Sequence, residues 1–187
     1  MSKKTIFQTL ADRGNPQEII ENGPYRCTKS PWLGEGYYFW DTFIELAHWW
    51  GEQGYHGKYV ITKMDIGFNP DEILDLVGNT EQIQMFYDYA SLLSKTLATT
   101  EITVGQVIEH MKAHTSFPYK AIRVEGRRSL GYFSFPYLKH QLVFKLYNKP
   151  YADFLPAIQI CFVDKSILDK YQLSIVYPDF YMDNYSI

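Results

Sequence analysis

Cysteine is scarce in this chain: only Cys27 and Cys161 occur, far apart and without Cys-x-x-Cys spacing. Such a spacing is typical of zinc sites, and an even set of closely spaced cysteines is typical of a disulfide framework. Neither pattern is present, so the sequence predicts neither kind of site. A reducing compartment, the cytoplasm, is the expected location.

Long apolar runs are also lacking. No segment approaches the roughly 20 consecutive apolar residues of a membrane-spanning helix. The first four residues, Met-Ser-Lys-Lys, are followed by an apolar stretch too short for a signal peptide. We therefore expect a cytoplasmic protein with no membrane partner, and any export would need a specialised secretion machinery.

The chain has no excess of positive charge. Its 18 Lys and Arg residues face 21 Asp and Glu residues, which leaves a net charge of -3. A protein that binds nucleic acid or an anionic membrane through its overall field is strongly basic, so the sequence gives no such global reason. A local basic patch stays compatible with these numbers.

Aromatic side chains, by contrast, are abundant: they make up 17% of the residues, and 16 of them are tyrosines. Such an excess suits a ligand that stacks on rings, and it equally suits a β-rich core. A chain of 187 residues fits one domain, large enough to bury about 70% of its unfolded surface. Because there is no internal repeat or low-complexity linker, we expect a single domain over residues 1–187.

Strand and helix patterns alternate along the chain. β-branched and aromatic runs predict strands at residues 5–10, 37–40, 58–66, 117–124, 156–164 and 173–177. Helical spacing predicts helices at residues 16–22, 43–50, 81–97 and 104–114, the last two forming a helical insertion at about residues 79–115. The buried side of the third helix is expected to carry Ile83, Phe86, Tyr87, Ala90, Leu93 and Leu97. This alternation predicts an α+β fold.

The most informative stretch is a glycine pair followed by aromatic residues. Gly34 and Gly36 allow the backbone to turn sharply and to approach a bound molecule closely, because neither has a Cβ. An aromatic strand follows, and Asp41 or Thr42 is placed to cap the next helix, which gives way to a turn over residues 51–57. This unit favours a ligand site, and the alternative is an ordinary turn into a core strand.

The order Gly34-x-Gly36-Tyr37-Tyr38-Phe39, followed at once by a helix with Ala47 and Trp50, resembles the second signature of the ADP-ribosyltransferase superfamily. The likeness is to its poly(ADP-ribose)-polymerase-like and diphtheria-toxin-like branch. It implies an ADP-ribosyltransferase-like split antiparallel β-sandwich with flanking helices, in which a cleft between two packed sheets binds NAD as substrate. It further implies that Tyr38 stacks on the nicotinamide, with Gly36 and Trp50 in the NAD site.

The first signature of that superfamily is a strand with a histidine, then a helix that ends in Asn-Gly. Counting back from Asn22 and Gly23 places the histidine position at Gln8 or Thr9. The resemblance implies that this position holds the ribose and amide of NAD. Gln can partly copy the donor and acceptor of a histidine, and Thr has a shorter reach. The alternative is that both are polar positions on an edge strand.

In the relatives, the loop after the first helix covers the adenosine and the diphosphate. Here that loop spans residues 25–32 and carries Arg26 and Lys29. A guanidinium offers two parallel donors to a phosphate, and an ammonium offers a point charge. Either cation can therefore pair with a diphosphate, and the alternative is that both are solvated surface residues.

The third signature is a strand with a glutamate that binds the ribose hydroxyl and stabilises a developing cation. Gln159, at the centre of the apolar strand over residues 156–164, is at that position. An amide can hold the hydroxyl, but it supplies no negative charge to the cation, so its electrostatic contribution to catalysis is expected to be smaller.

His110 and His114 stand four residues apart, a spacing that occurs in metal sites. A catalytic zinc pair of this spacing has a Glu after its first His and a third ligand, and neither is present. Solvated histidines near the C-terminal pole of a helix are the better interpretation. No metal is expected.

The resemblance therefore implies an NAD-dependent ADP-ribosyltransferase that modifies a macromolecule, protein or nucleic acid, with Tyr38 and Gln159 as catalytic residues. The resemblance extends to bacterial toxins and phage-defence effectors, for which an antitoxin or immunity protein would be a partner. One alternative is a catalytically degenerate module that binds NAD, ADP-ribose or a protein. Another is an interaction protein that shares only the sheet.

Overall fold

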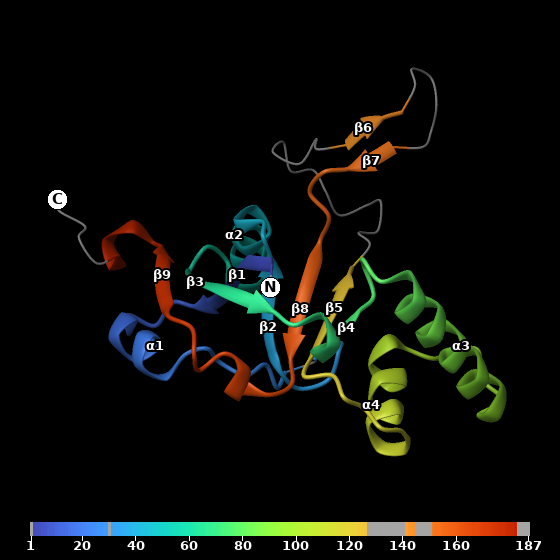
Figure 1. The fold of residues 1–187 in the computed structure, drawn as a ribbon. Coiled ribbons are helices and arrows are strands. Elements are labelled where there is room, and N and C mark those ends of the chain that lie inside the picture. The colour runs from blue at the N-terminus through green and yellow to red at the C-terminus, as the bar shows by residue number, and fades with distance from the viewer. Residues whose placement is uncertain (1, 30, 127–140, 145–150, 183–187) are drawn as a thin grey trace.

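The computed structural model describes residues 2–29, 31–126, 141–144 and 151–182. Within them, four helices flank a seven-stranded, mostly antiparallel sheet, so the predicted α+β class is confirmed (Figure 1). The strand order is β4-β5-β8-β2-β1-β3-β9, and a separate pair is formed by β6 and β7. The sheet comprises β1 (Ser2–Ala11), β2 (Tyr37–Asp41), β3 (Tyr59–Phe68), β4 (Ile73–Asp75), β5 (Ala121–Glu125), β8 (Ile158–Phe162) and β9 (Leu173–Tyr177). The remaining elements are α1 (Pro16–Asn22), α2 (Ile44–Tyr55), α3 (Thr80–Thr96), α4 (Val104–His114), β6 (Gln141–Val143) and β7 (Tyr151–Asp153).

The arrangement of the strands differs from the two packed sheets that we expected. The seven strands follow one hydrogen-bonded order, in which β4 and β5 run parallel and the other neighbours antiparallel. Three strands that are distant in sequence, β8, β2 and β1, are consecutive at the centre of this sheet. The residues around Gln159, Tyr38 and Gln8 are therefore brought side by side.

Both faces of the sheet are covered, because side chains alternate along each strand. Ile6 and Phe39 point into one buried cluster. Phe7 and Trp40 point into a second cluster on the opposite face, where they pack on Leu46 of α2. Helix α2 therefore covers one face of the sheet beside β1 and β2.

The start of α2 corrects the expected cap. The helix begins after Phe43, with no side-chain cap, rather than at Asp41 or Thr42. The Asp41 carboxylate is 1% exposed and accepts hydrogen bonds from Lys4 Nζ at 2.9 Å and from Arg123 Nε at 2.7 Å. The Asp41 carboxylate therefore pairs with Lys4 and Arg123, which are distant in sequence, and it does not cap α2 as the local pattern predicted.

The end of α2 also differs from the prediction, since the helix continues through Gly51 instead of giving way to a turn there. A Cβ on Gly51 would lie 2.3 Å from the ring of Tyr59. Glycine is needed at this position for the close approach of helix and strand, and its presence does not mark a turn.

The inserted helical pair, α3 and α4, matches the predicted ranges to within one residue and lies beside the β4 and β5 end of the sheet (Figure 1). The predicted buried side of α3 is largely wrong, because only Leu93 is buried. Ile83, Tyr87 and Leu97 are exposed, since α3 rests mainly on a narrow strip formed by Val107 and Met111 of α4. Among the described helices, none has the length and apolar character needed to cross a membrane.

Candidate functional site

The central strands β1 and β2 separate after a short paired segment and form a fork. In the described part of the chain, β1 pairs with β2 only at Ile6↔Asp41 and Phe7↔Trp40. On its other edge, β1 pairs with β3 along its whole length, from Ser2 to Ala11. The β2-facing edge of β1 beyond Phe7 is therefore free to border a cavity.

A cavity of about 550 Å³ occupies this fork. Its walls are the last four residues of β1, the turn and helix that follow, the loop over residues 25–29, β2, the far end of α2, and Gln159 of β8. Small-molecule sites in proteins have volumes of roughly 300–1,000 Å³. The volume therefore suits a small organic ligand, and all three segments that carry the resemblance contribute to it.

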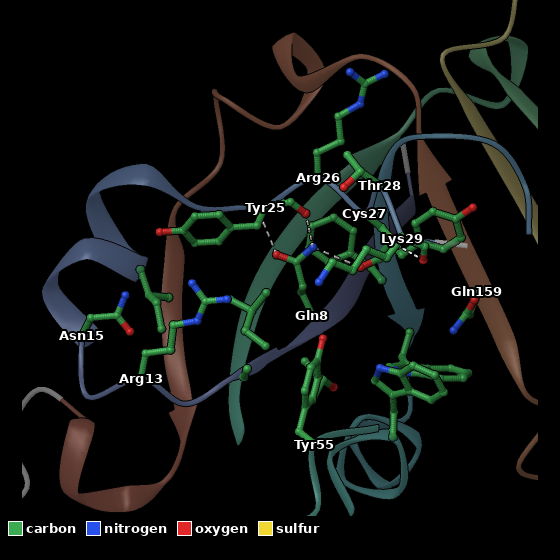
Figure 2. A pocket seen from close by; sticks show the side chains of 18 of the residues that line it. Gln8, Arg13, Asn15, Tyr25, Arg26, Cys27, Thr28, Lys29, Tyr55 and Gln159 are labelled. Carbon is green, nitrogen blue, oxygen red and sulfur yellow. Dashed lines mark hydrogen bonds between the residues drawn. The ribbon is translucent and has the colours of Figure 1, made fainter. Parts of the chain in front are cut away.

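Gln8 lines the centre of the cavity and holds the loop over residues 25–29 against β1 (Figure 2). Its Oε1 accepts a hydrogen bond from Tyr25 N at 2.9 Å, and its Nε2 donates to Tyr25 O at 2.8 Å. The same Nε2 lies 3.3 Å from Tyr38 O. Because both ends of the amide bond the protein backbone, the predicted ligand-holding residue also has a structural role.

The side chain of Thr9 lies on the face of the sheet that α2 covers, opposite to that of Gln8. Its hydroxyl donates to Ala47 O of α2 at 2.9 Å, and the residue is 8% exposed. Thr9 lines the cavity, but its one donor is already used.

Tyr38 lines the cavity too, and its hydroxyl is tied to the glycine turn. The hydroxyl accepts from Leu33 N at 2.8 Å and donates to Gly34 O at 2.8 Å. Burial, with a further contribution from the Cys161 thiol, raises the pKa of Tyr38 above its ordinary value. The phenol therefore stays protonated, and its oxygen is already bonded to the protein on both its donor and its acceptor side.

The glycine pair serves the contact between β2 and its surroundings. A Cβ on Gly36 would lie 2.5 Å from Cys161 Sγ and 2.6 Å from Phe162 O, so β8 leaves no room for a side chain. Gly34 has a φ of +88°, which favours glycine. Gly36 is not among the described residues that line the cavity, and the close approach that it permits is to β8.

Three cations line the cavity, namely Arg13 in the turn after β1, and Arg26 and Lys29 in the loop over residues 25–29. Arg26 also pairs with Glu35 at 3.3 Å, and both side chains are exposed. Among the described lining residues, Glu18 is the only acid. The cavity therefore has an excess of cations although the whole chain is slightly acidic.

Aromatic rings form another part of the cavity wall. Trp40 and Trp50 line the cavity and are linked through Trp49, with ring centroids 6.1 Å apart at each step. Trp50 is 42% exposed, and Tyr55, five residues later, also lines the cavity. A planar ring can therefore stack beside an exposed indole at this wall.

Gln159 lies on β8 at one end of the cavity, away from Arg13 and Asn15 at the other end (Figure 2). It stands directly opposite Trp40 in the ladder between β2 and β8. Its Oε1 accepts a hydrogen bond from Trp32 Nε1 at 3.0 Å. Gln159, the residue predicted at the position of the third signature, therefore lies at the cavity, and Trp32 hydrogen-bonds it.

Sequence reasoning placed seven residues in the site: Gln8, Thr9, Arg26, Tyr38, Trp50 and Gln159 line the cavity, and Gly36 does not. It missed Arg13 and Tyr55, which are brought in by the turn after β1 and by the extension of α2 past Gly51. A longer predicted α2 would have indicated Tyr55, whereas nothing in the local pattern marks Arg13.

Comparison of the chain with protein-family models, with curated proteins and with solved structures gave no match.

Proposed function

We propose that the cavity in the fork binds NAD or ADP-ribose, and that the chain is an ADP-ribosyltransferase-type domain that holds this ligand without cleaving it. The observation that carries the proposal is the convergence of three segments. The strands with Gln8, Tyr38 and Gln159 are consecutive in the sheet and line one cavity. In this interpretation the fork between β1 and β2 takes the part of the cleft between two sheets.

The chemistry of the walls suits a dinucleotide. Arg13, Arg26 and Lys29 offer charged donors of the kind that bind a diphosphate. Trp50 and Tyr55 offer rings on which a base or a nicotinamide can stack. Cations and aromatic rings in the lining of one cavity favour a ligand that has both phosphates and planar rings.

Binding without cleavage is favoured by what surrounds the predicted catalytic groups. The hydroxyl of Tyr38 and the amide of Gln8 bond the protein itself. Gln159 is neutral, and Glu18 is the only acid among the described lining residues. A carboxylate aimed at the developing charge is worth much of the rate in glycosidic cleavage, so a site without one is a weak catalyst.

The binding proposal is tested by isothermal titration calorimetry with NAD and with ADP-ribose. Replacing a cation that contacts the diphosphate should weaken binding by about tenfold, because a charge-assisted hydrogen bond is lost. We therefore expect this loss for Lys29→Gln. The matched control is Lys95→Gln, the same change at the end of α3, outside the cavity, which should bind like the wild type. Absence of any heat of binding with both ligands would refute the proposal.

Transfer of ADP-ribose to a macromolecular target is the second candidate function. It is favoured by the presence of both Tyr38 and Gln159 at one cavity. Cleavage of the nicotinamide bond would then depend on strain in the bound NAD and on stacking rather than on a carboxylate. The target, and any antitoxin or immunity protein, would be proteins or nucleic acids recognised outside the cavity.

Nicotinamide release separates the two candidates. At saturating NAD, in the presence of cell extract, a slow transferase should release nicotinamide, and Gln159→Glu should raise the rate because it adds the missing negative charge. If NAD binds but neither the wild type nor Gln159→Glu releases nicotinamide, the chain is a binding module.

A further inference from the structure

Trp32 lies at the end of the loop and has three contacts outside it, although it is 43% exposed and does not itself line the cavity. Its backbone carbonyl lies where a Cβ on Gly105, in the first turn of α4, would come within 2.7 Å. The tip of its ring lies 3.5 Å from the Cβ position of Gly126, just after β5. The third anchor is the hydrogen bond from its Nε1 to Gln159 Oε1 at 3.0 Å.

This third anchor sets the direction of the Gln159 amide. An indole N–H is a donor and cannot accept, so the amide must turn its oxygen to Trp32. The amide nitrogen then points the other way, and Figure 2 shows it on the cavity side of the side chain. Gln159 therefore offers the cavity two N–H donors, whereas its oxygen is turned to Trp32, which takes one of the two lone pairs of that oxygen.

We propose that Trp32 is a positioning residue that fixes Gln159 as a hydrogen-bond donor, so that the site selects a ligand with an acceptor oxygen at this point. This inference rests on the proposed function, because NAD and ADP-ribose are the ligands to which it is applied. A ribose hydroxyl or ring oxygen can accept from the amide nitrogen, and a group that only donates makes no hydrogen bond with that nitrogen.

The polarity has a chemical consequence. A carboxylate accepts from a ribose hydroxyl and adds electron density to the sugar, which favours a developing cation. A donor at the same place withdraws electron density from the hydroxyl oxygen and does the opposite. Fixing Gln159 as a donor therefore favours an intact bound ligand.

The experiment is a double-mutant cycle on the dissociation constants for ADP-ribose and NAD, measured by calorimetry. Gln159→Met keeps the volume and removes the donor, which should weaken binding by about fivefold. Trp32→Phe keeps a ring and removes the N–H, which frees the amide to take two orientations. If both are equally populated, only half of the protein is competent, and binding weakens by about twofold.

The cycle is decisive because a positioning residue acts only through its partner. Adding Trp32→Phe to Gln159→Met should cause no further loss. If Trp32→Phe weakens binding as much in that background as in the wild type, Trp32 acts by packing or by its own contact, and the inference is wrong.

A third variant tests the polarity itself. Gln159→Glu presents lone pairs in place of donors, so binding should weaken by about tenfold and stay weaker in about 0.5 M salt, where charge repulsion is screened. Equal or tighter binding would mean that the ligand donates to this position, which overturns the inference while leaving the proposed function intact. If the wild type binds neither ligand, both are refuted together. Circular dichroism on each variant confirms that it is folded.

Discussion

The clamp made by Gln8 gives the sharpest prediction about how the site is built. Gln8 is 5% exposed, and its amide makes two short hydrogen bonds to the backbone of Tyr25 and a longer one to Tyr38 O. Gln8→Leu keeps a side chain of similar size and removes all three. The loop that carries Arg26 and Lys29 then loses its attachment to β1.

The expected cost follows from these contacts. Each of the two short bonds contributes about 1 kcal/mol net, and leaving a buried N–H or C=O unpaired adds about 1–3 kcal/mol. Part of this is offset by the apolar surface of leucine and by water that reaches the loosened loop. We expect the free energy of unfolding to fall by about 2–4 kcal/mol, a large fraction of the 5–15 kcal/mol typical of a domain.

Urea denaturation at neutral pH measures this change directly. The control is Gln17→Leu, the same substitution at an exposed position of α1, which should stay within about 0.5 kcal/mol of the wild type. If Gln8→Leu is as stable as that control, Gln8 does not hold the loop, and its amide would be available for a ligand after all.

Two further predictions concern pH and buried charge. Burial lowers the pKa of His48, whose Nδ1 lies 2.9 Å from Tyr59 OH. The unfolded chain takes up a proton before the folded one, so the free energy of unfolding should decrease as the pH falls below about 6.5, and less so in His48→Gln. For Asp41, burial raises the pKa, but hydrogen bonds from Arg123 and Lys4 outweigh it and hold the pKa below its ordinary value. Its contribution is present above about pH 4 and is lost as the pH falls through the folded-state pKa, and Asp41→Asn should cost about 3–5 kcal/mol at neutral pH, measured by urea denaturation. An Asp41→Asn protein with unchanged stability would mean that the ion pairs are unimportant.

Much of the fold could be predicted because its signals are local. Thr103 caps α4 through a full capping box with Gln106, three residues later. Pro16 opens α1 as its ring favours. These features depend on residues within one turn of each other, which a sequence displays directly.

The misses have a common cause in contacts between different elements of the fold. Asp41 does not cap α2, because its carboxylate pairs with Arg123, 82 residues later. Gly51 is typical of a turn unless its contact with the ring of Tyr59 on β3 is known. The exposed face of α3 depends on how little of it α4 covers. The pattern within one element shows none of these contacts, because each joins two elements.

The candidate site was predicted better in membership than in role. The resemblance brought Gln8, Tyr38 and Gln159 together, and the sheet makes them neighbours. What each polar group bonds was beyond the sequence, because Trp32 is 127 residues from Gln159 and Tyr25 is 17 from Gln8.

The distribution of tryptophan has a consequence for how unfolding of this protein is observed. All four tryptophans, Trp32, Trp40, Trp49 and Trp50, lie around β2, α2 and Gln159, and the helical pair contains none. Intrinsic fluorescence therefore reports on the cavity region, whereas far-ultraviolet circular dichroism is dominated by helices, of which α3 is the longest described. Because α3 packs on so little, the two signals can change at different denaturant concentrations. Coincident transitions would establish one cooperative unit, and an earlier loss of dichroism would identify α3 and α4 as a unit that opens while the cavity stays formed.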